Sequence, residues 1–204
     1  MRSTFLRSLL LCGFLGLGST ANAATIFSDD FTANVPSLDN PVPIGWTIQN
    51  AGSVDIIGEC SSIVLNDWLP GNTCYIDLDG GTGANGLLTK TWFLTTGHTY
   101  TAYFDLAGNQ NFPFADTVTA NFAGVKQNFL IQPFVDFDTY QLSFTPAVAG
   151  TYSLSFINSN LDDYGALLDN VRINQVPGPL PLFGAATMLG FSRRLRARLR
   201  GFRR

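Results

Sequence analysis

The central part of this 204-residue sequence has very few basic residues. Nine of the 12 lysines and arginines lie in the first ten or the last twelve positions, and only Lys90, Lys126 and Arg172 lie between residues 24 and 175. All 15 acidic residues lie in that same range, so three basic against 15 acidic side chains give it a net charge of −12. A surface of this charge repels phosphate backbones and anionic lipids and attracts cations. The composition therefore argues against a nucleic-acid-binding role.

Recognised catalytic motifs are also missing from the sequence. It contains no G-x-S-x-G, H-E-x-x-H or P-loop pattern, and its single histidine, His98, is expected on the surface at a strand end. Acid–base and nucleophilic catalysis depend on histidine, activated cysteine or serine, or paired carboxylates, and no spacing here singles out a carboxylate pair. We therefore expect that the protein is not an enzyme.

Residues 1–23 have the three parts of a secretory signal peptide in the required order. A cationic region comes first, an apolar run from Leu9 to Leu17 follows, and Ala21-Asn22-Ala23 fits an A-x-A cleavage site. The alternative, a buried N-terminal helix, does not require this order. We expect signal peptidase to remove the segment, so that the mature chain begins near Ala24 in an oxidising compartment.

Cysteine is scarce, with three residues in the whole chain. Cys12 lies in the predicted signal peptide and follows Leu11, which is too large for a bacterial lipobox, so lipidation is not expected. Cys60 and Cys74 remain after cleavage, and in an oxidising compartment such a pair predicts a disulfide. Closing a loop of about 15 residues stabilises a fold by roughly 3 kcal/mol. A two-cysteine metal site is the alternative, but no histidine lies nearby.

Residues 24–175 have the alternation of an all-β domain. The stretch "HTYTAYFDLAG" places Tyr100, Ala102, Phe104 and Leu106 on one face of a strand. "DTVTANF", "TYQLSF" and "TYSLSF" repeat this two-residue period, and helical spacing is absent. Around ten such strands, at intervals of roughly 10–15 residues, predict a β-sandwich of the jelly-roll kind.

Residues 176–204 combine a short apolar run with a basic end. The run from Leu180 to Phe191 would span about 18 Å as a helix, against a bilayer core of about 30 Å, so it predicts a marginal transmembrane helix. Four arginines after it are expected to act as a stop-transfer signal that stays in the cytoplasm, namely Arg193, Arg194, Arg196 and Arg198. The alternative is a basic amphipathic tail that lies on lipid headgroups.

The stretch "VPGPLPLFGAATMLGFSRRLRAR" resembles a PEP-CTERM sorting signal, which has a short proline-containing motif, a short apolar helix and an arginine-rich end. The motif reads Val176-Pro177-Gly178-Pro179, with no glutamate where the namesake Pro-Glu-Pro has one. The resemblance implies processing near Pro177 to Pro179 by an exosortase, a membrane enzyme. It also implies a Gram-negative host that makes extracellular polysaccharide.

A second resemblance covers most of residues 24–175. "GWTIQNAGSVDIIG", "YIDLDGGTGANG", "YTAYFDLAGN" and "LLDNVRIN" are similar to the galactose-binding-like jelly rolls of secreted bacterial and plant cell-wall proteins. The resemblance implies a β-sandwich shaped like a carbohydrate-binding module. It does not identify a sugar, because a fold alone does not establish a function.

Two stretches have the residue types of a saccharide site, which pairs an aromatic ring with amide and carboxylate side chains. "NDWLPGNTCY" offers Trp68 beside three polar residues, Asn66, Asp67 and Asn72, and "GNQNFPF" offers a second set, Asn109, Gln110, Asn111 and Phe112. Trp46 and Trp92 lie in strand-like runs and are expected in the core. Trp68 has two interpretations, core packing and ligand stacking, and both stay open.

Asp169 is a candidate ligand for a structural Ca²⁺. Continuing the alternation back from Val171 and Ile173 puts Asp169 on the core face, where a carboxylate is costly unless it is paired or bound to a metal. The jelly-roll resemblance implies a calcium ion held by an acidic residue at this position and another near the first strand, which here is Asp30 or Asp29. Ordinary loop-facing aspartates are the alternative.

Together these observations predict an exported protein, transiently anchored in the inner membrane by its C-terminal helix and then placed at the cell surface or outside the cell. Exosortase and signal peptidase are its expected partners during export. The sandwich is expected to associate with extracellular polysaccharide. A purely structural or adhesive matrix protein and a secreted polysaccharide hydrolase are the alternatives.

Overall fold

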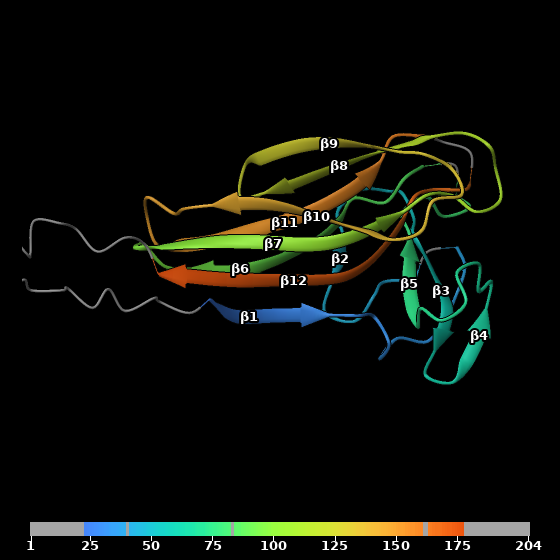
Figure 1. The fold of residues 1–204 in the computed structure, drawn as a ribbon, viewed down its shortest axis with the longest axis horizontal. Helices are drawn as coiled ribbons and strands as arrows, with labels where there is room; N and C mark the ends of the chain where they lie inside the picture. Colours follow the sequence, from blue (N-terminus) through green and yellow to red (C-terminus); the bar gives the residue numbers. More distant parts are fainter. Residues whose placement is uncertain (1–22, 40, 83, 161–162, 178–204) are drawn as a thin grey trace, which may run out of the picture.

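A computed structural model describes residues 23–39, 41–82, 84–160 and 163–177. These residues form two antiparallel β-sheets packed face to face, as the sequence predicts (Figure 1). Residues 1–22 of the predicted signal peptide lie outside the described residues, as do Gly178, Pro179, the apolar run and the arginines after it. No helix within the described ranges is long and apolar enough to cross a membrane.

The larger sheet has the strand order β10-β7-β12-β5-β3-β4, and β1 also pairs with β12. Its strands are β1 (Ala24–Asp29), β3 (Asp55–Cys60), β4 (Ile63–Leu65), β5 (Cys74–Asp77), β7 (His98–Ala107), β10 (Asp138–Phe144) and β12 (Leu167–Pro177). The smaller sheet has the order β2-β6-β11-β8-β9. Its strands are β2 (Thr47–Ile48), β6 (Leu88–Leu94), β8 (Asp116–Phe122), β9 (Val125–Ile131) and β11 (Gly150–Asn158).

The main core lies between the sheets and follows the predicted alternation. Tyr100, Ala102, Phe104 and Leu106 of β7 are all buried in it, so the face predicted from the sequence is confirmed. Trp46 is buried in the same cluster and Trp92 packs against it, as expected for residues in strand-like runs. His98 is the first residue of β7 and is partly buried rather than fully exposed.

A second apolar cluster lies on the outer face of the larger sheet. Its buried members are Ile57, Leu69, Tyr75, Ala107 and Leu167. Four of these are strand residues next to residues of the main core, such as Ile56, Ile76, Leu106 and Leu168. Neighbouring side chains of a strand point to opposite faces, so the larger sheet is apolar on both sides here. The apolar side chains on the outer face must be shielded from water, and the loop between β4 and β5 covers them.

Candidate functional site

The loop from Asn66 to Thr73 is held against the sheet by one side chain, Tyr75. The Tyr75 hydroxyl accepts hydrogen bonds from the backbone N–H groups of Trp68 (2.7 Å) and Leu69 (3.1 Å). It also lies 3.3 Å from Oδ1 of Asp67, to which it donates. Burial raises the pKa of this phenol to about 12, so it stays neutral and keeps its donor at all ordinary pH values.

A covalent bond holds the same loop at its base. Cys60 at the end of β3 and Cys74 at the start of β5 form the predicted disulfide. Beside it, Gly58 has a φ of +91°, and a Cβ there would lie 2.4 Å from the carbonyl oxygen of Thr73. Only glycine allows this close approach of the loop to β3. The phenol and the disulfide therefore fix the position of Trp68.

Trp68 lines a pocket of about 550 Å³ on the outer face of the larger sheet. The lining residues come from three loops: Trp68, Leu69, Pro70, Asn72, Gln110, Asp136 and Phe137. The loop after β7 supplies Gln110, and the loop between β9 and β10 supplies the last two. The combination of two aromatic rings, two amides and one carboxylate suits a ligand with both C–H faces and hydroxyl groups.

Trp68 packs against an apolar cluster, as one of its two interpretations predicts, and its stacking on a ligand stays a prediction. Its side chain packs against the outer apolar cluster together with Phe137, and it also lines the pocket. Phe137 in turn meets Tyr75 edge-on, with ring centroids 5.8 Å apart. The cluster therefore restricts the motion of the Trp68 ring, so less side-chain entropy would be lost when a ligand binds.

The predicted sugar-site residues separate into two groups. Trp68 and Asn72 line the pocket, whereas Asn66 and Asp67 are not among its lining residues. Asp67 accepts from Tyr75, and Asn66 has a φ of +47° in the turn that begins the loop. These two residues shape the loop, and the prediction included them because they are close to Trp68 in sequence.

The stretch after β7 contributes one pocket residue, Gln110. Its Nε2 donates to the carbonyls of Gly108 (2.8 Å) and Val135 (3.1 Å), which ties two pocket loops together. Asn109 is buried and structural, since its Nδ2 donates to the carbonyl of Tyr164 and its Oδ1 accepts the N–H of Asn111. The remaining member of the predicted set, Phe112, stacks on Tyr164 at 4.6 Å between ring centroids.

Sequence reasoning missed Asp136 and Phe137. They lie in "PFVDFD", where an aromatic residue stands between two carboxylates just before β10. The same criterion that selected Trp68 with its polar neighbours could have found this stretch. The sequence does not reveal that the loop after β7 meets the loop between β9 and β10. This contact depends on two hydrogen bonds to the carbonyl of Val135, one from the side chain of Gln110 and one from the N–H of Gly108.

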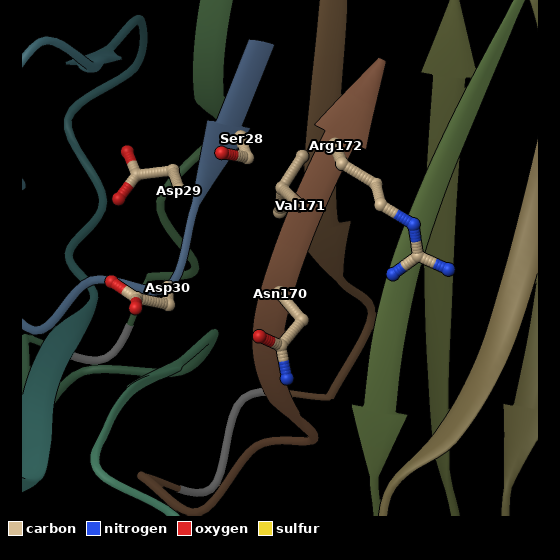
Figure 2. Close-up of a pocket in the computed structure, with 6 residues that line it drawn as sticks. All are labelled: Ser28, Asp29, Asp30, Asn170, Val171 and Arg172. Carbon is tan, nitrogen blue, oxygen red and sulfur yellow. The ribbon is translucent and has the colours of Figure 1, made fainter. Parts of the chain in front are cut away.

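A second, smaller pocket of about 260 Å³ lies where β1 ends beside β12 (Figure 2). Asp29, Asp30, Asn170 and Arg172 are among its lining residues. Figure 2 shows the Asp29 and Asp30 side chains on the side of β1 away from β12, while Arg172 extends toward β7. The Arg172 guanidinium lies 4.8 Å from the centre of the Tyr103 ring rather than against a carboxylate of the pocket.

The structure corrects the orientation predicted for Asp169. Between Asp169 and Arg172 the pairing of β12 with β7 shifts register, and Asn170 has a φ of +50°, as in a β-bulge. The bulge moves Asp169 to the outer face, opposite Asp105, while Val171 stays in the core. The alternation argument failed because it assumed a regular strand. Asp169 is nevertheless buried, with 3% of its surface exposed.

The surroundings of Asp169 are strongly negative. The pKa of its carboxyl is raised to about 7: burial is the main cause and the charges of Asp105, Asp30 and Asp29 add to it, whereas the N–H of Asn170 lowers it. This charge favours a bound cation. The carboxylate oxygens of Asp29 and Asp30, however, already accept hydrogen bonds. Asp29 accepts from Trp46 and Phe31, and Asp30 accepts from Thr32. Within the described parts of the chain, no group of three or more His, Cys, Asp or Glu residues is placed to hold a metal ion.

Another set of buried carboxylates lies where β3 pairs with β5. Asp77 accepts the N–H groups of Asp79 and Gly165, and burial raises its pKa well above the ordinary value. Asp55 accepts the N–H of Asp39, and burial raises the pKa of its carboxyl to about 6. Both side chains hold loop backbone in place, which is a structural role.

Comparison with known proteins supports the fold. No protein-family model matches the chain, and no curated protein matches it. Among solved structures, it is similar to the CBM22-1 xylan-binding domain of Xyn10C from Paenibacillus barcinonensis, with 12% identity, a TM-score of 0.52, and coverage of 78% of this chain and 99% of that one.

The tandem CBM22-1–CBM22-2 domain from the N-terminus of the same protein is also similar, with 14% identity and a TM-score of 0.53. The match covers 79% of this chain and 48% of the tandem, so the chain spans about half its length. At these identities the likeness shows the fold alone, a two-sheet β-sandwich that resembles those of carbohydrate-binding modules. It does not extend to the PEP-CTERM resemblance, which remains a prediction.

Proposed function

We propose that this protein is an exported surface or matrix protein that binds polysaccharide through the pocket beside Trp68. One observation carries the proposal: a tryptophan, fixed by a buried phenol and a disulfide, shares a pocket with Phe137, two amides and a carboxylate. The sugar's C–H face would stack on the rings, and its hydroxyls would bond to Asn72, Gln110 and Asp136. The xylan-binding domain with a similar fold supports this class of ligand.

Binding of the purified full-length protein to a panel of polysaccharides, including xylan, tests the proposal. Removing the stacking ring in Trp68→Ala should weaken binding at least about fivefold, if a sugar face gains about as much from an aromatic ring as a nucleobase does, which is about 1–3 kcal/mol. Phe93→Ala is the matched control, since Phe93 is an exposed aromatic on the smaller sheet with 68% of its surface accessible. Equal losses in the two variants, or no loss in Trp68→Ala, would reject this pocket.

Because Trp68 also supports the outer cluster, the thermal melt of each variant is measured alongside binding. Gln110→Ala provides a second readout from a different loop. It should weaken binding without removing an aromatic side chain from the cluster.

The export route is part of the same proposal. The Cys60–Cys74 disulfide and the sandwich suit an extracellular domain, and the C-terminal sequence resembles a sorting signal. Mass spectrometry of the protein recovered from its host should find a mature N-terminus near Ala24 and a C-terminus near Pro177 to Pro179. Recovery of the whole 204-residue chain from the cytosol would reject the export proposal.

Calcium near Asp169 and Asp30 remains a proposal as well. The raised pKa of Asp169 and its acidic neighbours support a cation at this end of β1, with backbone carbonyls as the remaining ligands.

A further inference from the structure

The Trp68 pocket has one ionisable lining residue, and that residue is acidic. Asp136 is exposed, and no lysine, arginine or histidine lines the pocket. Two more carboxylates stand one residue away from lining residues: Asp67 precedes Trp68, and Asp138 follows Phe137. A ligand that enters the pocket therefore meets the negative charge of Asp136, and these two other carboxylates lie outside the lining.

The basic residues of the described chain lie elsewhere. Lys90 sits over the rings of Phe27 and Trp46, at 4.5 and 5.4 Å from their centroids, and Arg172 sits over Tyr103. Lys126 belongs to β9, the edge strand of the smaller sheet. His98 begins β7, whereas the pocket loop follows the end of that strand, roughly 30 Å away at 3.3 Å per residue. None of these side chains lines the pocket to neutralise an acidic ligand.

The pocket walls also favour a cation over an anion. An ammonium group is attracted to the negative face of an aromatic ring, most strongly to that of tryptophan. Trp68 and Phe137 supply two rings on the same pocket as Asp136. A carboxylate or sulfate on a sugar would instead be repelled by Asp136, by about fivefold in affinity for one like-charge contact at 4 Å in water and low salt.

From this arrangement we infer that the pocket selects a polysaccharide that carries free amino groups, such as a partly deacetylated glucosamine polymer, over acidic glycans. The inference rests on the proposed function of this pocket. In this role Asp136 determines specificity, while the rings and amides bind the sugar as such.

Three sets of oligosaccharides test the inference. Glucosamine oligomers and their fully N-acetylated counterparts have the same backbone and differ at the nitrogen, which is a cationic amine in the first and a neutral acetamide in the second. Oligogalacturonate provides an anion. At low salt the full-length protein should bind the amino form about fivefold more tightly than the acetylated form, and should bind the anion most weakly. In 1 M salt, where the screening length is about 3 Å, the difference should largely disappear.

Asp136→Asn should remove most of the preference, because it should weaken binding of the amino oligomer about fivefold more than binding of the acetylated oligomer. The control is Asp39→Asn, which removes an equal charge from an exposed residue outside the pocket and should keep the preference. If Asp39→Asn abolishes the preference as well, the cause is the overall charge of the domain, and the inference is wrong.

The outcomes distinguish the inference from the proposal beneath it. Equal binding of amino and acetylated oligomers, with Trp68 still required, overturns the amino-sugar preference and leaves glycan binding intact. Binding of no polysaccharide in the panel overturns the proposed function itself.

Discussion

The two pockets of this sandwich are built in opposite ways. The Trp68 pocket is held by a neutral phenol and a covalent bond, so its position does not depend on the ionisation of any buried group. The pocket near Asp169 gathers carboxylates around a β-bulge, and the single arginine that lines it extends toward Tyr103. The first region is therefore rigid across ordinary pH, whereas the second should respond to protons and cations.

Removing the Cys60–Cys74 disulfide, which holds the loop of the Trp68 pocket, should have the largest effect on stability. Replacing both cysteines in Cys60→Ser/Cys74→Ser should lower the free energy of unfolding by about 3 kcal/mol, because the unfolded chain regains the freedom of a loop of about 15 residues. Polysaccharide binding should fall too, since the Trp68 loop loses its anchor. Urea unfolding together with binding measures both. Unchanged affinity in the folded double variant would show that Tyr75 alone positions the loop.

The second effect concerns Asp169 and depends on pH. A folded-state pKa of about 7, against 3.8 in the unfolded chain, means that the folded protein binds more protons between these values. Stability should therefore fall as pH rises from about 4 to about 7 and stay level above. In the presence of chelator, Asp169→Asn should be more stable than the parent at pH 8 by about 2 kcal/mol, and equal to it at pH 4.

The same pair of proteins tests calcium. If Ca²⁺ binds at Asp169, adding it at pH 8 should stabilise the parent and not Asp169→Asn. Asp55 and Asp77 also have raised pKa values, so some of the pH dependence should remain in the variant. If the stability of the two proteins depends on pH in the same way, folding does not raise the pKa of Asp169. A melting temperature that does not change when chelator is added would exclude calcium.

The smallest effect should come from Tyr75→Phe, which removes one oxygen atom. The N–H groups of Trp68 and Leu69 lose their acceptor, and stability should fall by about 1.5 kcal/mol. Polysaccharide affinity should fall by up to tenfold, because the loop that carries Trp68 becomes looser. Hydrogen exchange at these two amides, compared with exchange in the β7 strand, would report the loosening directly. Equal exchange in the variant and the parent would contradict it.

How far the sequence predicts this molecule depends on the range of the interactions involved. The faces of β7 follow from alternation alone, because the period of a strand is a local property. Trp68 and Asn72 could be found because they lie in one loop. Asp136 and Phe137 have the residue types of such a site, but their position beside Trp68 could not be predicted, since a hydrogen bond between Gln110 and Val135 brings their loop to the pocket. Asp169 was assigned to the wrong face because one extra residue in β12 shifts the alternation, and nothing local in "LLDNVRIN" marks the shift.

Strand β12 remains paired as far as its last two residues, with Val176 opposite Thr99 and Pro177 opposite His98. These residues also open the segment that resembles a sorting signal. The residues just before the proposed cleavage position are therefore part of the folded sheet. If the chain is processed there as proposed, the end of β12 would first have to unpair from β7, so local unfolding of this strand end would limit the rate of cutting.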